Sequence, residues 1–297
     1  MDKIEKERTK KTKQVLVTQN ITACKLGLYS QCAIARALKT SFINNFNPGD
    51  VQNICDVLVV NQHAIDVVVE FCEKGISAPY KDSWMNPVTM CTVNRADFVG
   101  TNFNQSEGIT DDIYNIRSNY NMIVSQGNPF PIKDKECVYN KFVTVIRDKN
   151  FQPIPLPLTY RFGVITTSAE NKPTLIDMNK MASSSFLNMM STIETVFQTA
   201  IYYGHNILLL TPIGQTNDEV PQEDVIKIYN SLIFKYQHKF KYIIVCVPEW
   251  DGIELFNMYD KYIVQPQKLC EETEEVNFTM KVKNNKTMNN KNKRERD

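Results

Sequence analysis

Residues 206–248 read NILLLTPIGQTNDEVPQEDVIKIYNSLIFKYQHKFKYIIVCVP, and this stretch decides the fold class. The apolar run at 207–210 predicts a buried strand, and residues 223–237 have apolar side chains at the three- and four-residue spacing of an amphipathic helix. A second apolar run, at 242–247, predicts another buried strand. Such alternation of strand and helix predicts a layered α/β domain with a mostly parallel or mixed sheet.

The same alternation continues toward both ends of the chain. Two helices are predicted to open the fold, at 13–27 and 31–43, with Gly27 as the stop signal of the first. Further strands are predicted at 56–61, 88–94 and 162–167, and extended pieces at 137–148 and 160–168. Further helices are predicted at 63–72, from about 111, at 185–203 and at 253–263. We expect one domain over residues 15–264, preceded by a basic segment 1–14 and followed by a disordered basic tail 265–297.

Composition excludes several classes of protein. The chain has 297 residues, 42% of them hydrophobic, and a formal net charge of +1, so no global field points to nucleic acid. The first residues are charged rather than apolar, and the apolar runs are too short for a bilayer, so neither a secretory signal nor a membrane partner is expected. Eight cysteines without CxxC spacing and only three histidines predict no disulfide framework, no metal site and no cofactor. An intracellular location, cytoplasmic or nuclear, is predicted.

The end of the chain is rich in lysine and arginine. Residues 281–297 read KVKNNKTMNNKNKRERD, with almost no apolar side chains. A solvated tail is the simplest interpretation, and nuclear targeting or contact with nucleic acid is the alternative.

Ligands of α/β sheets bind beyond the carboxyl ends of the strands, so the segments that follow the predicted strands hold the candidates. One such segment contains two adjacent acids, Asp111 and Asp112, at the start of a predicted helix. Acids in a first helical turn interact with unpaired N–H groups and with the helix dipole, so the pair has a purely structural interpretation. The alternative is an acid pair of an active site.

The order of the segments resembles the microbial-type poly(ADP-ribose) glycohydrolases of the macro-domain superfamily. In this chain Asn94 closes a strand as the family's asparagine does, and Gly108 stands where the family's Gly-Ala-x-Ala-Gln-Glu-Glu stretch begins. Asp111 and Asp112 fall on the two glutamates, and an Arg-Ser-Asn sequence from Arg117 follows at the family's offset. The resemblance implies a three-layer α/β/α macro-domain-like fold with additional N-terminal helices.

Downstream segments are also similar to the family. Residues 137–148 resemble its Val-Tyr-Ser-Pro-x-Val-x-Val-Phe-Arg-Asp segment, and residues 160–171 resemble its strand that ends in Thr-Ala/Ser-Ala-x-Pro-Asn. The segment LTPIGQTND occupies the place of a glycine-rich loop and retains Gly214. By this resemblance the expected ligand-binding residues are Asn94, Gly108, Ser168, Asn171, Thr211, Gly214, Gln215 and Thr216.

The chemistry implied by the resemblance is cleavage of a ribose–ribose glycosidic bond. Its oxocarbenium-like transition state needs a carboxylic acid that protonates the leaving oxygen and a positioned water that attacks. The expected catalytic residues are Asp111 and Asp112, of which Asp112 matches the family's catalytic glutamate.

This chain departs from the family in the same segments. It has GTNFN in place of Pro-Gly-Gly-Gly, and Thr211 and Thr216 replace glycines that would let backbone N–H groups approach a pyrophosphate. Aspartate is also one methylene shorter than glutamate. Three hypotheses follow: recognition of ADP-ribose or a related nucleotide with weak or no hydrolysis, an inactive fold used for protein contacts in a viral or structural assembly, and an active glycohydrolase that uses the Asp pair.

Overall fold

The computed structural model describes the main body of the chain and leaves out several connecting segments and the C-terminal end. The described residues are 3–28, 38–49, 53–77, 86–93, 109–120, 130–155, 160–170, 172–177, 179–214, 220–248 and 253–264. Side chains within 3–11, 74–77 and 109–112 are not described. The predicted tail 265–297 lies outside these ranges, and the predicted domain boundaries stay predictions.

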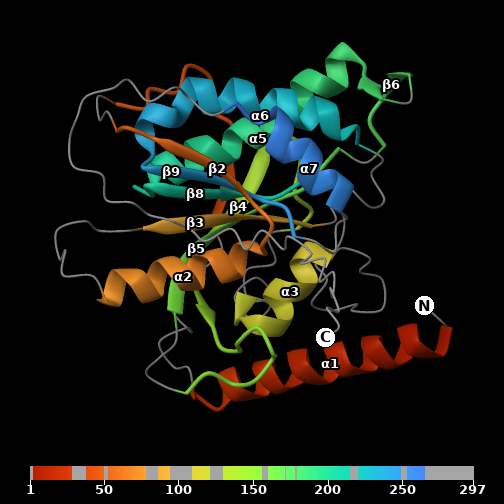
Figure 1. Cartoon of the computed structure of the whole chain (residues 1–297), viewed down its shortest axis with the longest axis vertical. Helices are drawn as coiled ribbons and strands as arrows, with labels where there is room; N and C mark the ends of the chain where they lie inside the picture. The colour runs from red at the N-terminus through yellow and green to blue at the C-terminus, as the bar shows by residue number, and fades with distance from the viewer. Residues whose placement is uncertain are drawn as a thin grey trace, which may run out of the picture. The chain divides into compact units, whose positions relative to one another are not determined.

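The core of the fold is a seven-stranded sheet in the order β1-β4-β5-β3-β8-β9-β2 (Figure 1). Strands β5, β3, β8, β9 and β2 run parallel, whereas β4 is antiparallel to both β5 and β1. The strands are β1 Leu38–Ser41, β2 Asp56–Val60, β3 Pro87–Thr92, β4 Glu136–Val145, β5 Tyr160–Thr167, β8 Ile207–Leu210 and β9 Tyr242–Cys246. The predicted central strands all lie in this one mixed sheet, so the predicted fold class is confirmed.

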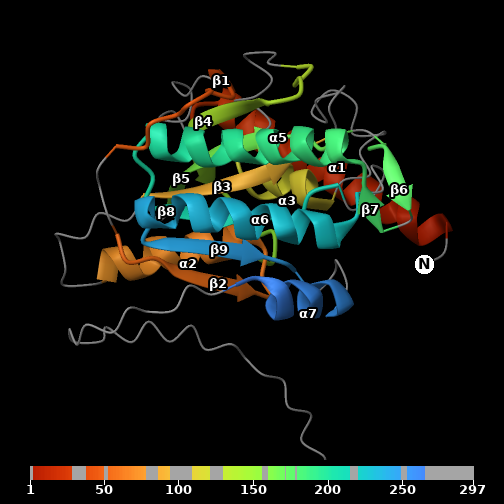
Figure 2. The same cartoon turned by 90° about the horizontal axis from the view of Figure 1, so that it is seen from above.

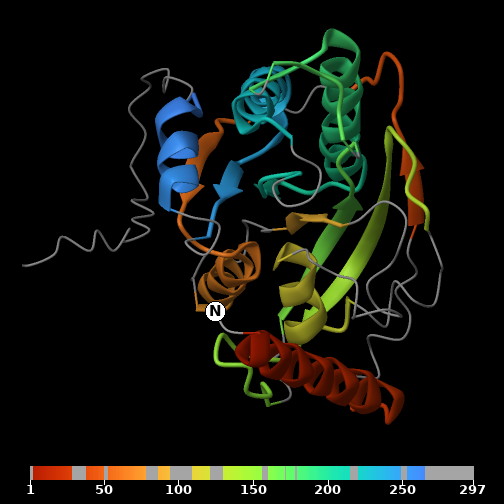
Figure 3. The same cartoon turned by 90° about the vertical axis from the view of Figure 1, so that its right-hand side faces the viewer.

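Helices cover both faces of the sheet, as the edge-on view in Figure 3 shows. One face carries α2 (Ala64–Ser77) and α3 (Ile109–Arg117), and the other carries α5 (Ser183–Tyr202), α6 (Gln222–Tyr236) and α7 (Ile253–Tyr262). Figure 2 shows α5 and α6 side by side, where Glu194 of α5 accepts hydrogen bonds from Lys235 and Tyr236 of α6. Smaller elements are the 3₁₀ turn η2 (Gln237–Lys239) and a separate hairpin of β6 (Leu175–Asp177) and β7 (Lys180–Met181).

The prediction of a second N-terminal helix at 31–43 is wrong for the part that the structure describes. Residues 38–41 form β1, in register from Leu38 opposite Tyr139 to Ser41 opposite Glu136. The hydroxyl of Thr40 lies 2.8 Å from Cys137 Sγ and 3.0 Å from Thr199 Oγ1. Pairing with β4 and contact with α5 therefore make this segment a strand, although its apolar residues have helical spacing. A local sequence pattern does not show that the edge of a sheet is available.

The first helix, α1, runs from Lys3 to Lys25 and packs on the outer side of α3 (Figure 3). Asn20 makes this contact: its Nδ2 donates to the carbonyl oxygen of Ile116 (2.6 Å), and its Oδ1 accepts from Arg147 Nε (2.7 Å). The helix passes through the predicted boundary between residues 14 and 15 without a break. Gly27, at φ +75°, follows the helix end as predicted.

Two buried histidines make the fold sensitive to acid. His205 Nδ1 lies 3.1 Å from the carbonyl oxygen of Asn86, which can only accept, so Nε2 accepts from the Tyr139 hydroxyl at 2.8 Å. Burial lowers the pKa of His205 from 6.5 to about 4, and burial lowers the pKa of His63 to about 3. Both imidazoles are therefore neutral in the folded protein at pH values where the unfolded chain takes up protons.

We expect the free energy of unfolding to fall as the pH drops from about 6.5 toward 4. Each histidine contributes a slope of roughly 1.4 kcal/mol per pH unit in that window, because the unfolded state binds one proton more than the folded state. Urea unfolding between pH 7 and pH 4.5 measures this slope. In the His205→Gln variant the slope should be smaller by roughly 1.4 kcal/mol per pH unit, because one proton fewer is taken up on unfolding. An unchanged slope would contradict a neutral, buried His205 in the folded protein.

Candidate functional site

The topology of the sheet marks one edge as the place for a ligand. Strands β3 and β8 are parallel neighbours, but the chain leaves β3 through α3 toward β4 and β5, whereas it leaves β8 through α6 toward β9. These two helices cover opposite faces of the sheet (Figure 3). Adjacent strands with diverging connections form the switch point at which open α/β sheets bind ligands, beyond their carboxyl ends. The segments that follow β3 and β8 are therefore the candidate site.

The predicted site residues lie on these segments and on the segment after β5. Asp111 and Asp112 are in the first turn of α3, which begins at Ile109, earlier than the predicted start near 111. A capping side chain precedes the first helical residue, so the pair does not occupy the cap position itself. The side chains of both acids lie outside the described residues, as do Asn94, Gly108, Asn171, Gln215 and Thr216.

Thr211 follows β8 directly and has a structural role. Its side chain is buried, and its hydroxyl donates to the carbonyl oxygen of Met90 in β3 at 3.3 Å. Its own carbonyl oxygen accepts from the Tyr229 hydroxyl at 2.5 Å. Thr211 thereby fastens the end of β8 to β3 and α6, and its hydroxyl is already used inside the protein.

Gly214 brings two loops together above β3. Its φ of +73° belongs to the left-handed region that favours glycine, and its carbonyl oxygen accepts from Val220 N at 3.2 Å. A Cβ at this position would lie 2.7 Å from Val220 Cβ and 3.2 Å from Ala169 Cβ. Ala169 follows β5 and Gly214 follows β8, so the two loops meet across the end of the intervening strand β3.

Near Ala169 in the chain, several side-chain oxygens are buried without a hydrogen-bond partner among the described residues. Ser168 is 1% exposed, and within the described part of the chain its Oγ has no hydrogen-bond partner. Thr167 Oγ1 and Glu170 Oε2 are also buried and have no hydrogen-bond partner in the described part of the chain. Buried polar atoms nearly always have partners, so each of these atoms is a candidate for contact with a ligand. Ser168 was predicted from the sequence, whereas Thr167 and Glu170 were missed, although they stand next to it in the same motif.

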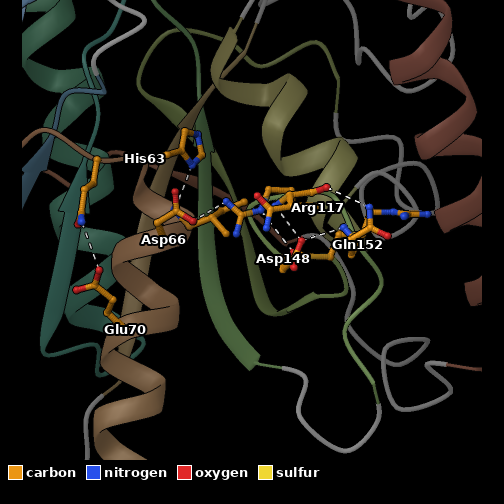
Figure 4. A network of polar contacts seen from close by, with 10 residues as sticks. His63, Asp66, Glu70, Arg117, Asp148 and Gln152 are labelled. Carbon is orange, nitrogen blue, oxygen red and sulfur yellow. Dashed lines mark hydrogen bonds and ion pairs between the residues drawn. The ribbon is translucent and has the colours of Figure 1, made fainter.

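The helix that carries the acid pair is held firmly at its other end (Figure 4). Arg117 Nη1 forms an ion pair with Asp66 Oδ1 of α2 at 2.7 Å, and Arg117 is 4% exposed. Asn119 Oδ1 accepts from Thr144 N in β4 at 2.7 Å, and Asn119 N donates to the Thr144 carbonyl oxygen at 3.1 Å. The Arg-Ser-Asn sequence that resembles the family therefore fixes α3 between α2 and β4.

One more side chain on α3 was missed by sequence reasoning. Asn115 is fully buried, and neither atom of its side-chain amide has a hydrogen-bond partner among the described residues. It lies three and four residues after Asp112 and Asp111, the spacing at which helical side chains are neighbours. The acid pair is thus followed, one turn later, by a buried amide.

The described residues contain neither a metal-binding cluster nor a membrane-spanning helix. No set of three or more His, Cys, Asp or Glu side chains there is grouped to hold a metal ion. Among the same residues, no helix has the length and apolar character needed to cross a membrane.

Solved structures with the same architecture include microbial poly(ADP-ribose) glycohydrolases. The enzyme from Thermomonospora curvata matches with a TM-score of 0.66 at 11% identity, over 84% of this chain and 99% of that chain. Its complex with the inhibitor ADP-HPD matches with a TM-score of 0.65 at 12% identity, over 84% and 98% of the two chains. This chain therefore has a poly(ADP-ribose) glycohydrolase fold.

The enzyme from Deinococcus radiodurans in complex with ADP-ribose has the same macro-domain-like fold, with a TM-score of 0.57 at 14% identity over 80% of this chain and 98% of that chain. No protein-family model matches the sequence, and no curated protein matches it. The resemblance of the sequence to this family is thus borne out at the level of the fold.

Proposed function

We propose that this protein recognises ADP-ribose or a closely related nucleotide at the carboxyl edge of β3, β5 and β8, with weak or no glycohydrolase activity. The observation that carries the proposal is the meeting of the loops after β5 and β8 at Gly214 and Ala169, directly beside the buried Ser168. It lies at the switch point of the sheet, where this class of fold binds ligands. The similar enzymes from T. curvata and D. radiodurans were solved with ADP-HPD and ADP-ribose, respectively, which supports the same ligand class.

Several features argue against strong hydrolysis. Asp112, which matches the family's catalytic glutamate, is one methylene shorter, and a misplacement of about 1 Å can cost roughly 10²-fold in rate. The segment after β3 has GTNFN where the resemblance expects glycines. The hydroxyl of Thr211, at another glycine position, is used to bond Met90. The phosphate contacts that would hold a substrate against the acid are therefore reduced.

Isothermal titration of the full chain with ADP-ribose tests the proposal, with AMP as the comparison ligand. We expect saturable binding of ADP-ribose near one equivalent and weaker binding of AMP, which lacks the second phosphate and the second ribose. Release of ADP-ribose from poly(ADP-ribose) should be slow or absent on the same sample. Absence of any binding heat, confirmed by an unchanged melting temperature at millimolar ADP-ribose, would overturn the proposal.

The second candidate function is protein contact, and one surface favours it. Phe234 on α6 is 80% exposed, and Tyr262 and Val264 at the end of α7 are 50% and 62% exposed. Asn230, one turn before Phe234, binds the carbonyl oxygen of Tyr262 at 2.8 Å and the N–H of Val264 at 2.9 Å. Contact with nucleic acid through the basic tail stays a prediction, since the tail lies outside the described residues.

A further inference from the structure

The carboxylate of Glu170 is held in place just after β5. Its Oε1 accepts a hydrogen bond from Ser185 Oγ at 3.3 Å, and the same hydroxyl accepts from the Thr174 N–H at 3.0 Å. Ser185 is buried in the first turn of α5. The chain of contacts from Thr174 through Ser185 therefore orients one oxygen of Glu170 and leaves the other to point elsewhere.

The second oxygen, Oε2, is buried and has no hydrogen-bond partner among the described residues. Ser168 Oγ, two residues earlier, is also buried and has no hydrogen-bond partner among the described residues. A carboxylate oxygen removed from water without a donor is costly, so a donor is required when the site is filled. Ala169 lies between these two residues in the chain and, across the end of β3, lies next to Gly214, so the segment that carries both oxygens borders the proposed ligand site.

The chemistry of the two groups selects the part of the ligand that they would contact. An ionised carboxylate only accepts hydrogen bonds and repels phosphate, whereas a serine hydroxyl can donate or accept. The hydroxyls of a ribose supply donors to a carboxylate, as they do for the acidic residue of dinucleotide-binding folds. Hydrogen bonds of this charge-assisted kind are about twice as strong as neutral ones.

We propose that Glu170, together with Ser168, binds a ribose hydroxyl of the ligand and not its phosphates. This proposal rests on the proposed recognition of ADP-ribose and assigns one part of that ligand to the segment after β5. It makes Glu170 a specificity-determining residue, because a ligand without a hydroxyl at this point would leave the buried Oε2 without a donor.

The test is titration of ADP-ribose into the full-length wild type and the Glu170→Gln variant. Glutamine keeps the shape and an oxygen that can accept from Ser185, but it removes the charge and replaces one acceptor with a donor. We expect binding weaker by about tenfold or more, because a hydrogen bond to a charged group is lost. The Glu170→Asp variant, which retains the charge on a shorter side chain, should lie between the two and guards against misfolding of the first variant.

The matched control is Ser185→Ala, which removes the bond that holds Glu170 but keeps its carboxylate. Its binding should weaken clearly less than that of Glu170→Gln, since the carboxylate and its charge remain and only the donor to Oε1 at 3.3 Å is lost. Equal weakening in Ser185→Ala and Glu170→Gln would overturn the proposal, because the carboxylate would then act only through the loop. Unchanged binding in Glu170→Gln would also overturn it, and tighter binding would place the carboxylate against the phosphates instead.

A wild type that does not bind ADP-ribose refutes the proposed function and the ribose assignment with it. A wild type that binds, with a Glu170→Gln variant that binds equally well, refutes only the ribose assignment. The two failures are therefore distinguishable in one series of titrations.

Discussion

Replacing Asp112 with glutamate should raise hydrolysis of poly(ADP-ribose) by about 10²-fold over the wild-type chain. The added methylene extends the carboxyl group by about 1 Å, a displacement that can change a rate by two orders of magnitude. Asp112 lies in the first turn of α3, and α3 is anchored at its far end by Arg117 and Asn119, so the longer side chain starts from a fixed backbone. Initial rates of ADP-ribose release at saturating substrate measure the gain.

The control is Asp112→Asn, which has nearly the shape of aspartate but cannot donate an acidic proton. It should show no hydrolysis above background, and its melting temperature should stay close to that of the wild type. The companion variant Asp111→Glu should gain little, because Asp112 is the residue that matches the family's catalytic glutamate. A rate in Asp112→Glu equal to the wild-type rate, with ADP-ribose binding intact, would show that reach does not limit the reaction.

The second large effect is expected at Gly214. Alanine there must adopt a left-handed backbone, which costs roughly 1–2 kcal/mol. Its Cβ would also lie only 2.7 Å from Val220 Cβ. Overpacking of this kind typically costs a further 1–3 kcal/mol. We expect the free energy of unfolding of Gly214→Ala to fall by about 2–5 kcal/mol. ADP-ribose binding should be weakened as well, because the loops after β5 and β8 would separate.

Gly204 provides the matched control for this substitution. Its φ is +71°, nearly that of Gly214, but a Cβ at Gly204 would meet nothing within 4 Å. Gly204→Ala should therefore show the backbone cost without the contact cost and should leave ADP-ribose binding unchanged. Urea unfolding of both variants separates the two costs. Equal destabilisation of the two proteins would contradict the close approach of Gly214 to Val220 and Ala169.

The elements that the sequence predicted correctly are those whose pattern is complete within the element. Residues 207–210 and 242–246 are short apolar runs because they form strands buried on both faces, between α6 on one side and α2 on the other. Helix α6 shows the spacing of an amphipathic helix because one side contacts the sheet. In such segments the pattern of apolar residues follows directly from which side chains are buried, so the pattern is enough to predict the strand or helix.

The segment at 38–41 has no such self-sufficient pattern. Its apolar residues fit a helix locally, but the unpaired edge of β4 supplies hydrogen bonds that only the folded sheet can offer. The internal hydrogen bond of Thr211 could not be predicted from the sequence either, and its predicted place among the ligand-binding residues stays a prediction. Its hydroxyl bonds Met90, which is far away in sequence and adjacent only through the register of β3 and β8.

For the candidate site, the sequence by itself determined the order of strands and loops along the chain and the resemblance to a glycohydrolase. It also determined where the acid pair and Gly214 stand relative to the strands. Tertiary structure decided which loops meet, because the approach of Gly214 to Ala169 depends on β5 and β8 flanking β3 in the sheet. It also decided that Ser168 and Glu170 carry buried oxygens there. Hydrogen-bond satisfaction depends on distances between segments far apart in the chain, and those distances exist only after the sheet has formed.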